Sequence, residues 1–128
     1  MVEANHYRAP ENRTLTIDER MLLEWLIANG SPSAAKYAAQ IPRVSVVSRC
    51  TCGCPTIDLA VDGKHADGGS ELVADFVGKS PEGIQVGVIL HCRGGQISEL
   101  EVYALDQVKG AFGLPCPDAL VAFGDAEP

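Results

Sequence analysis

The sequence predicts an α+β protein in which two N-terminal helices pack on a mainly antiparallel sheet. Apolar residues recur at helical spacing up to about residue 41, whereas they alternate with polar residues from residue 43 onward. Helical and strand patterns are thus segregated along the chain, which is typical of α+β folds. With 128 residues and no internal repeat, we expect a single domain over 15–123. Residues 1–14 are predicted to be a flexible arm and residues 124–128 a frayed tail.

Two helices are predicted at the start of the domain. Thr16 and Glu19 form the Thr-x-x-Glu pattern of a capping box, and Gly30 stands where a left-handed C-cap belongs. The apolar stripe between them predicts an amphipathic helix over 17–29. A second, alanine-rich helix is predicted over 32–40, because Ser31-Pro32 is a typical helix start and Pro42 ends the segment.

Strands follow the helices. The segment over 84–92 is apolar on both faces, which predicts a central position in the sheet. Two glycines in 93–96 predict a hairpin turn, and the segment after Asp106 is expected to fold back over the sheet. On the return strand we expect one face to carry Ile97, Glu99, Glu101 and Tyr103, and the other Ser98, Leu100 and Val102. The predicted strands are 43–50, 56–62, 72–77, 84–92 and 97–103.

The charge distribution excludes some classes of partner. The formal net charge is −7, and residues 51–128 alone carry four basic and twelve acidic side chains. Such a surface repels nucleic acid and anionic membranes, and no Lys/Arg cluster offsets the repulsion. We expect no nucleic-acid or membrane partner. No signal peptide or membrane-spanning run is evident, so we expect a cytoplasmic protein.

The cysteines are the most unusual feature of the sequence. Cys50, Cys52 and Cys54 alternate with other residues, and a flat strand would separate successive side chains by about 6.6 Å. Tetrahedral zinc needs its sulfurs only about 3.8 Å apart, so binding requires a bend, which Gly53 and Pro55 permit. Cys92 is the fourth ligand in our zinc hypothesis, with His91 and Cys116 as alternatives. Buried core thiols are the favoured interpretation, and redox or disulfide chemistry is a third.

A second candidate site is an interaction surface on the last predicted strand. Glu99, Glu101 and Tyr103 share one face there, and a charged row with an aromatic anchor suits a protein partner. A plain solvated sheet face is the alternative interpretation. No zinc-protease, nucleophile-elbow or phosphate-loop motif occurs, so we predict no catalytic residues and no bound cofactor other than zinc.

Two strings resemble a known kind of protein. Cys52-Gly53-Cys54-Pro55-Thr56, together with the stretch from Gly95 to Tyr103 that reads Gly-Gln-Ile-Ser-Glu-Leu-Glu-Val-Tyr, is similar to small bacterial domains of unknown function. The resemblance covers residues 15–105 loosely. It implies a small intracellular α+β protein and transfers no catalytic role to any residue.

Three functional hypotheses follow from the sequence. The first is a non-enzymatic domain that binds a protein partner or itself through its acidic sheet surface, with a homodimer slightly favoured. The second is a zinc-binding domain built on Cys50, Cys52 and Cys54. The third is a small hydrolase or redox enzyme, which requires Cys54 or the Glu99–Glu101 pair to converge with His91 in a pocket.

Overall fold

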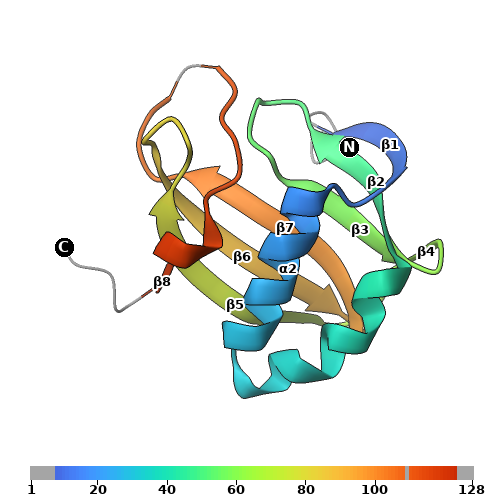
Figure 1. Ribbon diagram of the computed structural model, residues 1–128. Helices are drawn as coiled ribbons and strands as arrows, with labels where there is room; N and C mark the ends of the chain where they lie inside the picture. Colours follow the sequence, from blue (N-terminus) through green and yellow to red (C-terminus); the bar gives the residue numbers. More distant parts are fainter. Residues whose placement is uncertain (1–7, 109, 124–128) are drawn as a thin grey trace.

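The computed structural model describes residues 8–108 and 110–123. These residues form an α+β structure with an eight-stranded antiparallel sheet, one α-helix and a long 3₁₀ helix (Figure 1). The predicted α+β composition is therefore confirmed. The predicted frayed tail at 124–128 lies outside the described residues. No helix in the described part of the chain is long and apolar enough to cross a membrane.

The first element is a strand, β1 (Arg8–Thr14), where the sequence predicted a flexible arm. It pairs antiparallel with β2 (Val44–Cys50) at the edge of the sheet. The edge position tolerates Pro10, which lacks a backbone N–H, and the register shifts between Pro10 and Arg13. The arm prediction is wrong for these residues, because pairing with residues 31 to 42 positions away leaves no local signal. Residues 1–7 lie outside the described part.

The helix α2 (Ile17–Asn29) starts at the predicted capping box, with reciprocal hydrogen bonds between Thr16 and Glu19. Gly30 ends it, but with a φ of −80° rather than in the predicted left-handed conformation. Glycine is needed there because a Cβ would collide with the carbonyl oxygen of Val73. The second helix, η1 (Pro32–Arg43), is 3₁₀ instead of α and includes Pro42 within its length.

The remaining strands are β3 (Ile57–Val61), β4 (Lys64–His65), β5 (Ser70–Lys79), β6 (Gln85–Arg93), β7 (Gln96–Ala104) and β8 (Val121–Ala122), and a short 3₁₀ helix, η2 (Pro117–Ala119), precedes β8. The sheet has the strand order β1-β2-β3-β7-β6-β5-β8, and β4 pairs with β3. The predicted central strand, β6, indeed lies between two long neighbours, β5 and β7. The short β8 covers the far edge of β5.

A register shift in β7 corrects one predicted face. His91 pairs with Glu99, but the next residue, Cys92, pairs with Ile97, so an extra residue interrupts the alternation. Ile97 is therefore fully buried on the same face as Leu100, not beside Glu99 as predicted.

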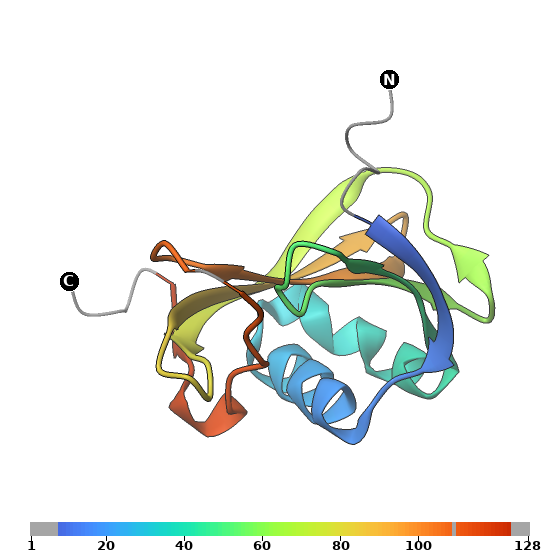
Figure 2. The ribbon, with the colours of Figure 1, turned by 90° about the horizontal axis from the view of Figure 1, so that it is seen from above.

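The helices α2 and η1 lie on one side of the sheet (Figure 2). Trp25 of α2 makes an edge-on contact with Phe76 of β5, with ring centroids 4.8 Å apart, and the N–H of Ser31 donates a hydrogen bond to Val73. The core between these layers is built from Leu, Ile and Val side chains of both. The opposite sheet face carries most of the polar side chains considered below.

Candidate functional site

Three of the five cysteines lie in the loop that joins β2 to β3. Cys50 is the last residue of β2, and its backbone N–H donates a hydrogen bond to the carbonyl oxygen of Thr56, which closes the loop. Gly53 turns the chain with a φ of 106°, a left-handed conformation that glycine adopts without strain. The segment is therefore bent at a residue that the sequence analysis identified as able to bend it.

The bend brings three sulfur atoms together. The Sγ atom of Cys52 lies 2.8 Å from Cys50 Sγ and 3.0 Å from Cys54 Sγ. All three sulfurs lie within 4.8 Å of one another. The backbone N–H of Cys52 donates to Cys50 Sγ and that of Cys54 to Cys52 Sγ, each over 3.4 Å. These backbone donors hold the turn in place around the sulfurs.

Burial differs among the three thiols. Cys50 is buried, Cys54 is half-buried and Cys52 is exposed. The favoured interpretation of core thiols thus describes Cys50 but is wrong for Cys52. An exposed thiol in contact with two others is open to a metal ion from solvent.

The other predicted ligands lie elsewhere. Among the described residues, the cluster of close metal-ligating atoms contains only the three loop cysteines. Cys92 is fully buried beside Tyr37, and burial raises the pKa of its thiol to about 12, so it is protonated at neutral pH. Cys116 is exposed and precedes η2. His91 lies on β6 and hydrogen-bonds to a carboxylate.

A cavity of about 320 Å³ adjoins the thiol cluster, with Arg13, Glu19 and Ala111 in its wall. Glu19 accepts two hydrogen bonds from Arg13, of 2.9 and 3.0 Å. Burial alone would raise the pKa of Glu19, but the hydrogen bonds from Arg13 and Thr16 outweigh it, and the pKa lies below its usual value. The Glu19 carboxylate is therefore ionised and already neutralised by Arg13.

The loop also contacts the C-terminal part of the chain. The N–H of Phe112 donates a 3.1 Å hydrogen bond to the carbonyl oxygen of Gly53. A Cβ on Gly53 would stand 3.2 Å from Cα of Ala111, so this approach is close. The loop that carries the three thiols thus packs against the segment that follows β7.

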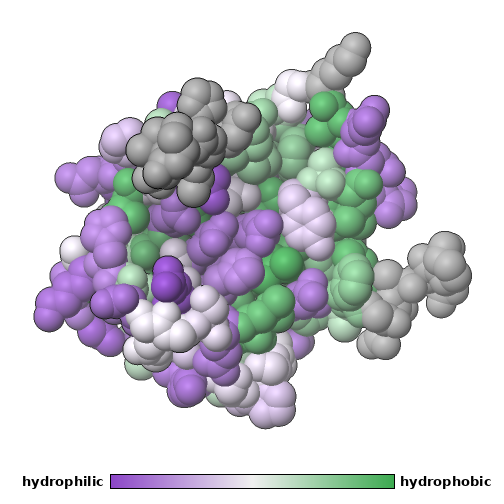
Figure 3. Space-filling model, turned by 180° about the vertical axis from the view of Figure 1, so that it is seen from behind, coloured by the Kyte–Doolittle hydropathy of each residue, from purple (hydrophilic) through white to green (hydrophobic). Residues whose placement is uncertain are grey.

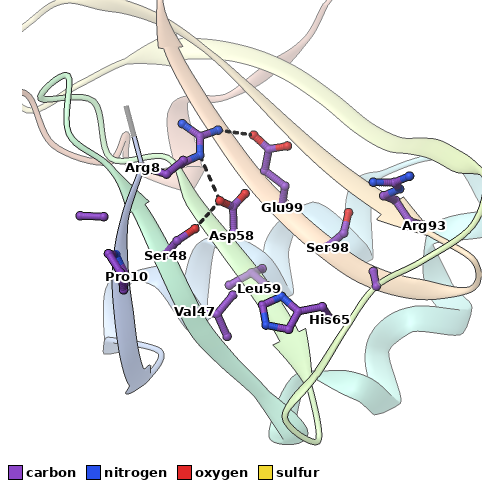
Figure 4. A pocket seen from close by; sticks show the side chains of 12 residues that line it. Arg8, Pro10, Val47, Ser48, Asp58, Leu59, His65, Arg93, Ser98 and Glu99 are labelled. Atoms are coloured by element: carbon purple, nitrogen blue, oxygen red, sulfur yellow. Dashed lines mark hydrogen bonds and ion pairs between the residues drawn. The ribbon is translucent and has the colours of Figure 1, made fainter. Parts of the chain in front are cut away.

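A second group of polar side chains lies on the sheet face turned away from α2. Figure 3 shows hydrophilic side chains gathered over the middle of that face, beside an apolar area. At one end Arg8 of β1 reaches across β2 and bridges two carboxylates (Figure 4). Its Nε lies 3.0 Å from Asp58 and its Nη2 lies 3.4 Å from Glu99. Ser48 donates a further hydrogen bond to Asp58.

The same face continues with His91, whose Nε2 lies 2.7 Å from a carboxylate oxygen of Glu101. Tyr103 lies over Gly87, where a Cβ would overlap its ring. Asp75 of β5 completes the row, and its Oδ1 atom is buried without a hydrogen-bond partner among the described residues.

Burial and neighbouring like charges raise the pKa values of three residues in this row. Burial raises the pKa of Glu99, and Asp58 and Glu101 add to the rise, while His91 and Arg8 oppose it. Burial also raises the pKa of Asp75. The pKa of Tyr103 is raised by burial and then by the negative charge of Asp75 and Glu101. The face therefore holds more carboxylates than its cations neutralise.

The structure thus brings the predicted surface residues Glu99, Glu101 and Tyr103 to one face, but the two carboxylates are engaged by Arg8 and His91. Sequence reasoning missed Arg8, Asp58 and Asp75 as members of this group. Alternation along β3 and β5 would have placed the two aspartates on that face. Arg8 had no such signal, because its segment showed no period.

The third hypothesis required convergence with His91. Glu99 and Glu101 do share a sheet face with His91, whereas Cys54 belongs to the β2–β3 loop and is not in the His91 row.

Comparison with protein-family models, curated proteins and solved structures finds no match to this chain. The resemblance to small bacterial domains therefore rests on its two strings alone.

Proposed function

We propose that this protein is a thiolate metal-binding domain that holds a zinc ion through Cys50, Cys52 and Cys54. The convergence of the three sulfurs within 4.8 Å carries the proposal. Uncharged thiols gain little from such proximity, whereas three thiolates crowded together repel one another unless a cation lies between them. A bound zinc ion requires the sulfurs to separate to about 3.8 Å. The exposed position of Cys52 allows that movement.

The proposed site has an open coordination position. With three protein ligands, the fourth position of a tetrahedral zinc ion is filled by water or by another small ligand. Because the loop contacts Gly110–Phe112 through Gly53, bound zinc also stabilises the packing of the C-terminal segment. Three free thiols this close together need a reducing compartment, which supports a cytoplasmic location.

Native mass spectrometry under reducing conditions tests the proposal. The wild-type protein, purified without added metal, is expected to carry one zinc ion per chain and to lose it to a chelator with a fall in melting temperature. Cys52→Ser is expected to lose the zinc. Cys116→Ser is the matched control, because it removes another exposed thiol outside the cluster. A zinc-free wild type that still takes up none on titration with ZnCl₂ contradicts the proposal.

A second candidate is protein binding through the sheet face that carries Glu99, Glu101 and Tyr103. The surplus of carboxylates over cations among the described residues of this face favours it. A basic protein surface is the complementary partner, and self-association as a homodimer is the alternative.

Charge reversal distinguishes the binding of a basic partner from self-association. Glu101→Lys is expected to abolish capture of a basic partner from cells while the far-UV spectrum stays unchanged, and Glu24→Lys on α2 is the control. Light scattering reports the oligomeric state of the same samples. Unchanged capture by Glu101→Lys, together with a monomeric wild type, would exclude this candidate.

A further inference from the structure

The molecule has a second hollow that is independent of the thiol cluster. A cavity of about 500 Å³ lies between β1, β2 and β3 on one side and the end of β7 on the other, within the volume range usual for small-molecule sites. Figure 4 shows Asp58, Glu99, Ser98 and His65 arranged around it, with Arg8 near one end and Arg93 at the other. Apolar side chains, among them Leu59 and Val47, complete the wall.

One end of this cavity is anionic. Arg8 is shared between Asp58 and Glu99, so one positive charge faces two carboxylates. One oxygen of each carboxylate, Asp58 Oδ1 and Glu99 Oε1, makes no hydrogen bond among the described residues and remains able to accept one. A donor group with a positive charge matches this end.

The other end is cationic. Arg93 and His65 are exposed, and neither forms an ion pair within residues 8–108 and 110–123. The Nε atom of Arg93 donates to the carbonyl oxygen of Gly68, which fixes the side chain, and its two Nη groups make no hydrogen bond within the part of the chain that the structure describes. Such a guanidinium matches a carboxylate or another planar anion.

We propose that this cavity binds a small zwitterion, with an amine against Asp58 and Glu99 and an acid group against Arg93 and His65. The two ends of the cavity have opposite charge, so a ligand with both charges gains at each end, whereas a singly charged one gains at only one. The apolar wall between the ends suits a short aliphatic spacer.

A length series of ω-amino acids tests the proposal on the full chain. Glycine, β-alanine, 4-aminobutyrate and 5-aminovalerate are titrated while amide NMR shifts of the cavity residues are followed. One length is expected to bind at least about tenfold more tightly than acetate or methylamine, because only it satisfies both ends. The proposal is overturned if no amino acid shifts these resonances, or if acetate or methylamine binds as tightly as the best of them.

Two variants locate the charges. Arg93→Gln is expected to weaken binding of the best amino acid about tenfold or more and to leave methylamine binding unchanged. Glu99→Gln is expected to weaken the binding of the amino acid and of methylamine alike. Arg20→Gln on α2 removes an exposed arginine from the helix side of the sheet and is expected to change neither. Equal affinities of Arg93→Gln and Arg20→Gln for the amino acid would contradict the proposed orientation and with it the site.

Discussion

Replacing Arg13 with glutamine tests whether an ion pair anchors β1 to α2. Arg13 donates two hydrogen bonds to Glu19, whose side chain is only 9% exposed. The variant leaves that carboxylate with the backbone N–H of Thr16, at 2.8 Å, as its remaining close donor. A nearly buried carboxylate without its cation destabilises the folded state.

The magnitude follows from the geometry. Hydrogen bonds to charged groups contribute about 1.5–3 kcal/mol each. Because the Arg13 side chain is 34% exposed, solvent screens part of this contribution. We expect Arg13→Gln to lower the free energy of unfolding by about 2–3 kcal/mol at pH 7.

The pH dependence gives the reasoning a second check. The folded-state pKa of Glu19 lies below its usual value, so the stability it contributes is present above the unfolded-state pKa of about 4.3. It is lost as the pH falls through the lowered folded-state pKa. The difference in the free energy of unfolding between wild type and Arg13→Gln is therefore expected to be largest at pH 7 and to shrink below about pH 4.

Urea unfolding followed by the fluorescence of Trp25, the single tryptophan, measures both effects. Arg20→Gln is the control, because it removes an exposed arginine that makes no ion pair in the described part of the chain. A loss of unfolding free energy below about 0.5 kcal/mol at pH 7 would refute the proposed anchor. A loss below about pH 4 that equals the loss at pH 7 would also refute it.

Two further substitutions test the sheet. Thr56 is 4% exposed, and its hydroxyl both donates to and accepts from the backbone of Val102; Thr56→Val is expected to cost about 2–3 kcal/mol in urea unfolding, and Thr56→Ser much less. Burial raises the pKa of Asp75, so the folded state loses stability as the pH rises through that pKa. Asp75→Asn removes this loss of stability and is expected to raise the melting temperature at pH 7 but not at pH 3. A melting temperature below that of the wild type at pH 7 would contradict this expectation.

The local elements were predictable because neighbouring residues determine them. The Thr16–Glu19 capping box begins α2 as predicted, since both hydrogen bonds lie within three residues. Two glycines with positive φ, Gly94 and Gly95, form the hairpin turn between β6 and β7. The central place of β6 also followed from its sequence, since its largely apolar run suits a strand that lies between two neighbours, here β5 and β7.

The candidate sites were predictable only in part. The cysteine segment and its bend at Gly53 could be identified from residue types, because glycine is the residue that adopts a left-handed φ without strain. Whether Cys92 joined the cluster depended on which face of β6 it occupied and on what packed there, and it lies in the core beside Tyr37. Spacing along the chain carries no information on the distance between Cys92 and the three loop cysteines.

By itself the sequence determined the α+β class, the start of α2, the hairpin and the presence of a bendable three-thiol segment, because each depends on dihedral preferences and contacts within a few residues. Only the tertiary structure decided that Arg8 reaches Asp58 and Glu99, that Ile97 turns into the core, and that two hollows of different chemistry result. Those outcomes depend on pairing between residues up to 46 positions apart, as between Phe76 and Ala122. Such pairing is selected by the burial of the whole sheet and not by any local pattern.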